Sequence, residues 1–422
     1  MRDRHPENLM ASVEAPDDLT LAVRWREPYA NANILGYQQL DPLPRHLLEE
    51  KFTNNRSGFA VGEEWTTGYV GSGPYRLERW TPGSGMIAQA NVDWFAGPPK
   101  IQTLDIRFIS DSGTLIANLL SGEVDIVTSP GVRSSDVGVV RGQWGDRGYV
   151  KTWQTSLRYM EFQLREVPNW QQAVTDLRVR RALMHAADRN GLIDAVSDGL
   201  GRLGDAFIVS NEQIFPEVDR AVTKYAYDPR RAIELLGEAG WRAQSANAPL
   251  TNATGQPLEI DVWSTAGGGE SEVSILAANF RTIGIGSKEY LIPAARQRDN
   301  ELRTSFPGVA TTSRTTNLEN FVFTSANVPK PEQRFQGPNR GSFVDAEVDR
   351  LYDLAIRSVN QDERRHAIVA LHQRMSKTLG IGPLFFDPRI VLAWNRVTGP
   401  VGNFSGQQGI TWNIYEWEIT SS

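Results

Sequence analysis

The pattern of apolar and polar residues predicts alternating strands and helices along most of the chain. Through Thr103–Ile109, apolar side chains alternate with polar ones, which is typical of a half-buried strand. The segment 111–122 then has apolar residues at helical spacing, with Asp111 as a candidate N-cap and Gly122 as the C-terminal stop. Val124–Val127 is the next apolar run. A helix that joins two strands over so short a distance predicts a parallel pair with a right-handed crossover.

The same pattern recurs further along the chain. A strand at Leu258–Val262, a helix from Val273 to Ile283 and a strand at Ser287–Ile292 predict a second strand–helix–strand unit. Other helices are predicted after Asp176, from Asn190 to Gly199 and after the cap Asp228-Pro229, and two amphipathic helices near 345–357 and 362–379. Leu19, Leu21, Val23 and Trp25 alternate with polar or small residues and predict a strand close to the amino end. The chain is therefore predicted to be of the α/β class.

Composition narrows the class of protein. The chain has 422 residues, which is more than one core usually supports, so two or three domains are expected. Its net charge of −6 argues against a nucleic-acid-binding protein. No stretch of apolar residues is long enough to cross a membrane. There is no cysteine, which excludes disulfides, thiolate metal sites and cysteine nucleophiles.

Several short motifs stand in a family-like order. Gly71, Gly73, Pro74 and Tyr75 belong to GSGPY, Asp93, Trp94 and Gly97 to an aromatic turn, and Gly122, Glu123 and Asp125 to LLSGEVDI. Further matches are LRVRRALMHAADRNGLI from Leu177, YDPRRAIELLGEAGW from Tyr227 and GSFVDAEVDRLYDLA from Gly341. Together they resemble extracellular solute-binding protein family 5, the peptide- and nickel-type substrate-binding proteins of ABC transporters. The resemblance covers nearly the whole chain.

The amino end departs from the family. It has no apolar region of the kind found in a signal peptide. Val13–Val23 matches a motif that family members carry well inside the protein. We therefore expect that an N-terminal portion, including the export signal, is missing from this chain.

The resemblance implies a bilobal fold of the type II periplasmic-binding-protein kind, with an additional partial domain. Residues 1–67 would be the remnant of the extra N-terminal-side domain, 68–157 plus 395–422 the first α/β lobe, and 158–394 the second. In such receptors the ligand lies between the lobes, and closure is a hinge motion. The hinges are expected near Thr152–Phe162 and Leu392–Val397.

Motifs for catalysis or cofactor binding are missing from the sequence. The five histidines form no cluster with metal-ligand spacing, and no H-E-x-x-H, G-x-S-x-G or Walker motif occurs. Gly199–Gly204 matches G-x-G-x-x-G, but it follows a helix and precedes a predicted strand at Ala206–Val209, the reverse of the order that a dinucleotide site needs. Gly267–Gly269 lies between a strand and a helix, where it could hold an anion or be a plain loop. We expect no catalytic residue, no metal and no cofactor.

The resemblance also directs attention to the ligand site. Peptide-binding relatives place an Asp, which pairs with the ligand's ammonium group, in the region matched here by 306–316, and no acidic residue occurs between Leu302 and Leu318. Thr311, Thr312 and Arg314 offer hydroxyls and a guanidinium instead, which suit a polyol, a carboxylate or a blocked peptide. Tyr159 and Trp263 are further candidates for ligand contacts. A solvated loop position for Arg314 and core packing for the two aromatic residues remain open alternatives.

The predicted function is a substrate-binding receptor of an ABC importer that captures a peptide-like compound, an oligosaccharide or another small polar solute. Its predicted partners are this ligand and a membrane permease, with no nucleic acid, and the protein is predicted to be a monomer in the periplasm or at the cell surface, where it could be a lipoprotein. One alternative is an extracytoplasmic sensor or chaperone-like binding protein of the same fold. A hydrolase is the other.

Overall fold

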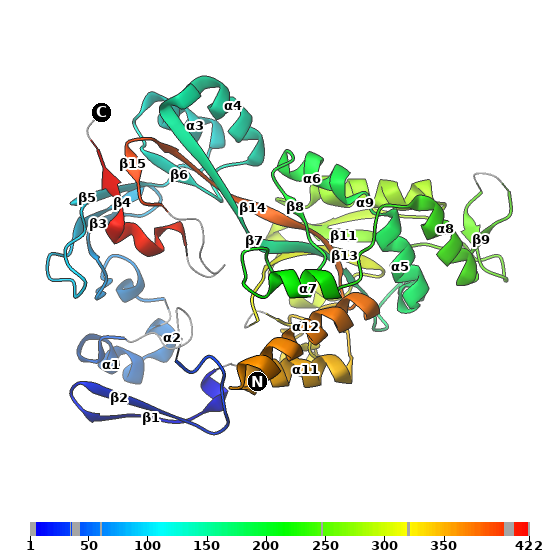
Figure 1. Ribbon diagram of the computed structural model, residues 1–422, viewed down its shortest axis with the longest axis horizontal. Coiled ribbons are helices and arrows are strands. Elements are labelled where there is room, and N and C mark those ends of the chain that lie inside the picture. Colours follow the sequence, from blue (N-terminus) through cyan, green and yellow to red (C-terminus); the bar gives the residue numbers. More distant parts are fainter. Residues whose placement is uncertain are drawn as a thin grey trace. The chain divides into compact units, whose positions relative to one another are not determined.

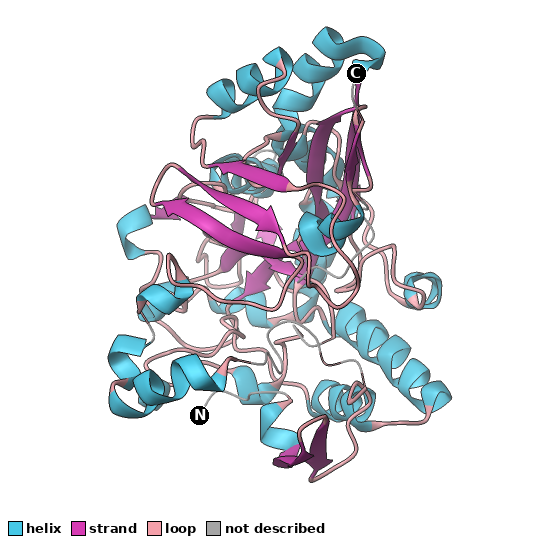
Figure 2. Ribbon diagram, turned by 90° about the vertical axis from the view of Figure 1, so that its left-hand side faces the viewer, coloured by secondary structure: helices cyan, strands magenta, loops and turns pink. Residues whose placement is uncertain are grey.

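The computed structural model describes residues 6–33, 35, 43–59, 61–245, 248–318, 321–400 and 409–420. The chain divides into two compact units, each made from two separate segments. Unit 1 contains Met1–Leu35 and Gln154–Pro388, and unit 2 contains Gly36–Trp153 and Arg389–Ser422. Helices and strands occur in both units, as Figures 1 and 2 show. The predicted α/β class is confirmed.

The boundaries between the units lie inside two long strands, β7 (Gly148–Phe162) and β14 (Gly382–Trp394). The predicted hinge segments 152–162 and 392–397 overlap these strands. The predicted remnant 1–67 divides between the two units after Leu35. The division into three domains stays a prediction.

Unit 1 is built on a mixed sheet with the strand order β12-β11-β13-β7-β14, and β8 pairs with the far side of β14. The shorter strands are β8 (Arg202–Leu203), β11 (Val262–Thr265), β12 (Glu289–Ile292) and β13 (Val309–Thr315). β11 pairs in parallel with β12 and β13, whereas β13 runs antiparallel to β7. Helix α9 (Glu270–Thr282) connects β11 to β12. The second predicted strand–helix–strand unit is therefore confirmed, except that its first strand begins at Val262, where the predicted strand Leu258–Val262 ends.

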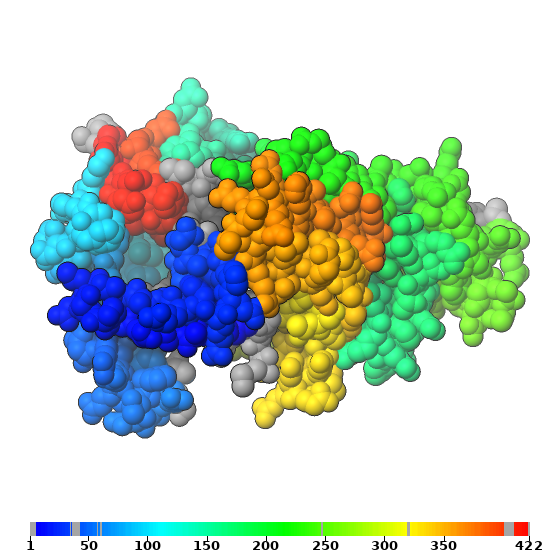
Figure 3. All heavy atoms as spheres, turned by 60° about the horizontal axis from the view of Figure 1, so that its bottom comes forward, coloured from blue at the N-terminus to red at the C-terminus, as the bar shows by residue number. Residues whose placement is uncertain are grey.

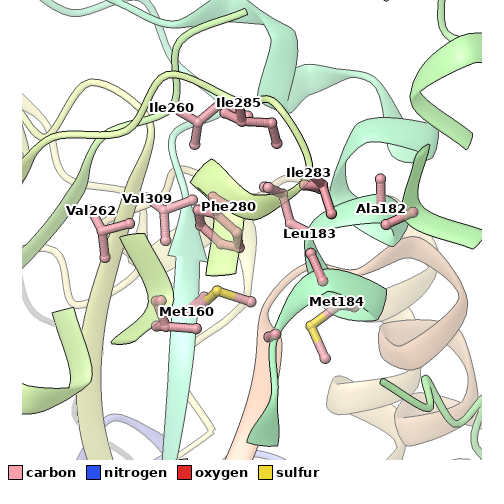
Figure 4. Close-up of a cluster of buried hydrophobic side chains, with 14 of the residues drawn as sticks. Met160, Ala182, Leu183, Met184, Ile260, Val262, Phe280, Ile283, Ile285 and Val309 are labelled. Atoms are coloured by element: carbon pink, nitrogen blue, oxygen red, sulfur yellow. The ribbon is translucent and has the colours of Figure 1, made fainter. Parts of the chain in front are cut away.

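One face of this sheet carries the main hydrophobic core. Met160, Val262 and Val309 project from three neighbouring strands, and Phe280 of α9 and Leu183 of α5 pack against them (Figure 4). All five are fully buried. The helices over this face include α5 (Leu177–Ala186), α6 (Arg189–Ser197) and α8 (Pro229–Glu238). Asp176, Asp188 and Asp228 are the N-caps of these three helices and accept hydrogen bonds from backbone N–H groups of the first turn. Because Asp188 is the cap of α6, this helix begins at Arg189 rather than at the predicted Asn190.

A second core lies on the opposite face of the sheet. Leu157 and Tyr159 of β7 pack with Phe323 and with Leu371 of α12. Helices α11 (Ala346–Arg357) and α12 (Gln361–Thr378) lie side by side on the surface of unit 1, and they form the orange patch in Figure 3. Both predicted amphipathic helices are confirmed, and they begin after the caps Asp345 and Asn360.

Near the amino end, β1 (Met10–Asp17) and β2 (Thr20–Trp25) pair as an antiparallel hairpin within unit 1. The base of this hairpin is anchored, because Leu9 and Tyr29 pack with Ile356 of α11. The outer end is not covered by any described residue of unit 1, and Leu19 is 98% exposed. The predicted strand is confirmed as β2.

Unit 2 contains a three-stranded antiparallel sheet of β3 (Tyr75–Thr81), β4 (Gly85–Ala90) and β5 (Thr103–Arg107). Helix α3 (Ser112–Ser121) follows, with Asp111 as its N-cap and Gly122 in the left-handed conformation at its end. The next strand, β6 (Ile126–Thr128), pairs antiparallel with the last part of β14. The predicted parallel pair is therefore wrong. β5 pairs with β4, which precedes it in the chain, whereas β6 pairs with β14, which is distant in the sequence.

The remaining elements are short. Unit 2 also contains α1 (Arg45–Asn54), α2 (Arg56–Phe59), α4 (Ser134–Trp144), β15 (Val397–Thr398) and β16 (Glu418–Ile419). Unit 1 also contains α7 (Phe215–Ala221), β9 (Arg242–Ala243), β10 (Leu250–Thr251) and α10 (Asn300–Arg303). None of the helices in the described ranges combines the length and the apolar character needed to cross a membrane.

Candidate functional site

A pocket lies on unit 1 beside strands β7, β11 and β13. Its cavity volume is about 20 Å³, which is room for about one water-sized molecule, because a cavity needs roughly 10–15 Å³ to hold a water. The lining side chains that carry charge or hydrogen-bonding groups include Glu161, Trp263, Thr265, Arg303, Thr312 and Arg340. The strand register brings several of them to one face of the sheet, because Glu161 is opposite Ala310, and Tyr159 is opposite Thr312. We take this pocket as the candidate ligand site.

Glu161 is the acidic residue of the pocket lining. Its carboxylate belongs to a residue that is only 3% exposed. Burial raises the pKa of this carboxyl, while the guanidinium groups of Arg340, Arg314 and Arg303 oppose that rise. A buried carboxylate requires such partners, since an isolated buried charge costs several kcal/mol.

Three arginines therefore surround one carboxylate. The pKa of Arg303 is lowered, first by burial and next by the like charge of Arg340, with Arg314 adding to the effect. Within the described residues, none of the three forms a close ion pair with a carboxylate. The Nε atom of Arg314 is buried and has no hydrogen-bond partner there. Arg303 and Arg340 line the pocket together with Glu161, so its lining carries two positive charges and one negative charge.

Buried amide side chains fix the two segments that supply Arg303 and Arg340. Gln163, at the end of β7, donates from Nε2 to the carbonyl oxygens of Thr304 and Phe306 at 2.9 and 3.0 Å, next to Arg303. Asn339 donates from Nδ2 to the carbonyl oxygens of Thr324 and Phe343 at 3.0 and 2.8 Å, next to Arg340. Both amides are almost completely buried. The charged groups therefore sit on locally rigid backbone.

The five predicted site residues do not all lie in the same environment. Trp263 and Thr312 line the pocket, and the Trp263 ring packs on Tyr290 with a centroid distance of 4.2 Å. Arg314 lies close to Tyr159 and Glu161. A ligand role for each of the three stays a prediction.

The other two predicted residues are deeply buried. Tyr159 is 1% exposed, and its ring packs edge-on against Phe207 and Phe323. Burial and the Glu161 carboxylate raise the pKa of Tyr159 to about 12, so its hydroxyl is neutral. Thr311 is opposite Met160, which belongs to the main core, so its side chain leaves the sheet on the other face from Thr312. Thr311 is nevertheless one of the residues that line the pocket, and a ligand role for either residue stays a prediction.

Sequence reasoning missed Glu161, Arg303 and Arg340. The segment between Leu302 and Leu318 contains no carboxylate, but the strand register brings Glu161 next to it from β7. The one available signal was an acidic residue between Met160 and Phe162, because a charge inside an apolar strand needs a partner.

In the loop Gly267–Gly269, a candidate anion site in the sequence, two backbone N–H groups bind a side chain of the same loop region. Those of Gly267 and Gly268 donate to the carboxylate of Glu270 at 2.6 and 2.8 Å. These bonds lower the pKa of Glu270, the one to Gly267 most strongly. The loop thus holds a carboxylate of its own chain.

A buried ion pair lies next to this loop, on the opposite face of the sheet from the pocket. Arg158 donates to Glu272 and to Asp387, each at 2.7 Å, and also to the carbonyl oxygen of Gly268. Ser313 donates to the second oxygen of Asp387 at 3.1 Å. This network connects β7, β13, β14 and the start of α9.

The G-x-G-x-x-G segment at Gly199–Gly204 connects α6 to the region after β8. Packing is tight there, because a Cβ atom on Gly204 would lie 2.4 Å from the Leu157 side chain. The predicted strand at Ala206–Val209 is wrong; these residues are buried in irregular backbone. No group of three or more His, Asp or Glu residues among the described positions is arranged to hold a metal ion.

Comparisons with known proteins agree with the fold. A candidate ABC transporter peptide-binding protein of Brucella ovis is 29% identical over 255 residues, which are 60% of this chain and 45% of that protein. Oligopeptide-binding protein AppA of Bacillus subtilis is 25% identical over 252 residues, or 57% of this chain and 42% of AppA. The chain spans about half the length of these curated relatives.

Solved structures extend the likeness to nearly all of the chain. NikZ from Campylobacter jejuni, in complex with Ni(L-His), superposes with a TM-score of 0.76 at 21% identity, covering 97% of this chain and 79% of NikZ. The predicted type II periplasmic-binding-protein-like fold is confirmed. The family model for bacterial extracellular solute-binding proteins, family 5 Middle, matches residues 3–317. This chain therefore belongs to the bacterial extracellular solute-binding proteins of family 5.

Proposed function

We propose that this chain is the ligand-binding part of a receptor that captures a small polar solute and delivers it to an ABC permease in the membrane. The observation that carries the proposal is the pocket of unit 1, in which charged side chains are held on rigid backbone in a chain that belongs to a solute-binding family. The receptor works as a monomer in the periplasm or at the cell surface, needs no cofactor and catalyses no reaction.

The pocket chemistry favours binding over catalysis. Its hydroxyl groups come from threonine and serine, and no histidine lies among its lining residues that could act as their base. The charged groups are one carboxylate and several guanidinium groups, which bind ionic ligands strongly but are poor proton carriers near neutral pH.

The same charges bear on the ligand class. An unblocked peptide brings an ammonium group, which needs a buried carboxylate as partner. Glu161 could supply it, but this carboxylate already faces Arg303, Arg314 and Arg340. The ammonium would therefore enter a region with excess positive charge. Unblocked di- and oligopeptides are not the preferred ligands of this receptor, and a polyol, a carboxylate or a blocked peptide suits the pocket better.

Melting curves with a compound panel test the proposal. The panel contains unblocked peptides, N-acetylated peptides, oligosaccharides and metal chelates. A ligand at 100 times its Kd stabilises the folded state by about 2.7 kcal/mol, which gives a clear rise in Tm. We expect at least one class other than unblocked peptides to raise Tm. If all classes leave Tm unchanged, the receptor function is refuted; if unblocked peptides bind tightly and lose binding on N-acetylation, the proposed ligand class is wrong.

A further inference from the structure

We propose that a second pocket of unit 1, next to Trp170 and Trp241, binds a neutral saccharide. This Trp170–Trp241 pocket has a volume of about 980 Å³, near the upper end of the usual range for small-molecule sites, ~300–1,000 Å³. It shares no lining residue with the pocket beside β7, β11 and β13, whose volume is about 20 Å³. The inference goes beyond the proposed receptor function and does not depend on it.

The two indole rings are held in place by the surrounding fold. Trp170 donates from Nε1 to the carbonyl oxygen of Gln163 at 3.0 Å, and Gln163 is completely buried. Trp241 follows α8 and packs against the main core of unit 1. Both rings are nevertheless partly exposed and line the pocket. A fixed indole ring offers a large apolar contact area at little cost in conformational entropy, and this area suits the C–H face of a sugar ring.

Amide side chains are the commonest polar groups of the lining. They belong to Asn169, Gln171, Gln172, Asn252 and Gln256. Each amide carries two N–H donors and a carbonyl acceptor, and a sugar hydroxyl likewise both donates and accepts. Amides and hydroxyls therefore match each other without any charge.

The fold uses some of these polar groups and leaves others for a ligand. Gln171 accepts the backbone N–H of Asp261 at 2.7 Å, which fixes this wall of the pocket to the residue that precedes β11. By contrast, the side chains of Gln172, Glu259 and Lys288 have no hydrogen-bond partner within the ranges that the structure describes. The pocket thus combines a rigid frame with hydrogen-bonding groups that a ligand can engage.

Charges of both signs line the pocket, which favours a neutral ligand. The carboxylates of Asp176, Glu259 and Asp261 repel an anion. A cation is not matched either, because Asp176 is paired with Arg178 at 2.6 Å and the ammonium group of Lys288 also lines the pocket. A neutral saccharide gains hydrogen bonds from both kinds of charged group without this repulsion.

Isothermal titration calorimetry of the full chain with maltotriose and cellotriose tests the proposal, and co-sedimentation with insoluble starch and cellulose distinguishes a free oligosaccharide from a polysaccharide. At least one of these saccharides should bind. Gln172→Ala should weaken that binding about fivefold or more, because it removes a hydrogen-bonding side chain, and Trp170→Leu about tenfold or more, because it removes the ring. Gln336→Ala is the matched control, since Gln336 is an exposed glutamine of unit 1 outside both pockets.

Melting curves without ligand show which variants are folded. Gln172→Ala keeps the test decisive if Trp170→Leu does not fold, because the Gln172 side chain forms no hydrogen bond with any described residue. Saccharide binding that is equal in the wild type and in both variants overturns the site, and so does a lack of binding to every saccharide, soluble or insoluble. Binding that is lost in Trp263→Phe but kept in both variants places the saccharide in the pocket of unit 1, which overturns this inference and leaves the receptor function intact.

Discussion

Replacing Glu272 by Gln should remove a pH-dependent loss of stability. Glu272 is 1% exposed, and its Oε1 has no hydrogen-bond partner among the described residues. It shares the guanidinium of Arg158 with a second carboxylate, Asp387. Burial, reinforced by Asp387 and only partly offset by Arg158, raises the pKa of Glu272 to about 7. The folded protein therefore holds this proton at pH values where the unfolded chain has lost it.

The sign and size of the effect follow from proton linkage. Between the ordinary value of 4.5 and about 7, the folded state binds more protons than the unfolded state, so the free energy of unfolding falls as the pH rises through this window. At about 1.4 kcal/mol per pH unit, the loss attributable to Glu272 is about 3 kcal/mol. Gln has the same size and can still accept a hydrogen bond from Arg158, but it carries no charge.

Urea unfolding of the wild type and Glu272→Gln, measured between about pH 4.5 and about pH 8, gives the required comparison. The difference in unfolding free energy between the variant and the wild type should grow in favour of the variant as the pH rises. Glu234→Gln is the control, since Glu234 is exposed in its pair with Arg231. Parallel pH profiles for wild type and Glu272→Gln, or a difference that grows in favour of the wild type, would refute the reasoning.

Three further substitutions test the packing of the two units. Phe280→Ala removes a fully buried ring from the main core of unit 1 and should cost about 3–5 kcal/mol in urea unfolding, and a cost below 1 kcal/mol would contradict that core. Asp345→Ala removes the N-cap of α11 and the partner of Arg374 at 2.9 Å, and should lower stability by about 1–2 kcal/mol; Asp345→Asn should retain most of the cap, and equal losses would contradict the capping role. Arg396→Ala in unit 2 removes a bond to Asp125 at 2.7 Å and one to the carbonyl oxygen of Gly122 at 3.0 Å, so a calorimetric scan should show a lower melting transition, by about 1 kcal/mol in stability, and an unchanged scan would contradict it.

Local signals in the sequence predicted helices well. Asp176, Asp228 and Asp345 cap helices because a short acidic side chain can reach the free N–H groups of the first turn, which lies within a few residues. The parallel pair of β11 and β12 was also predictable, since a single helix joins the two strands and packs on them. In each case the residues that determine the element lie close together in the sequence.

The errors arose where distant segments determine the structure. β6 pairs with β14, and nothing in 103–127 indicates that partner. The candidate site shows the same limit, because Glu161 of β7 reaches the pocket only through its register with β13. Thr311 and Thr312 are adjacent in sequence, but adjacent strand residues point to opposite faces of the sheet.

Tryptophan fluorescence tests most directly whether ligand binds in the pocket of unit 1. Trp263 lines this pocket, and its ring packs on Tyr290, so a bound ligand should change its emission. The chain contains twelve tryptophans, and the difference between wild type and Trp263→Phe isolates the signal of this one. Ligand should change the emission of the wild type but not that of Trp263→Phe, with calorimetry confirming that both proteins are saturated. An equal change in both proteins at saturation would show that the ligand binds elsewhere and would contradict the account.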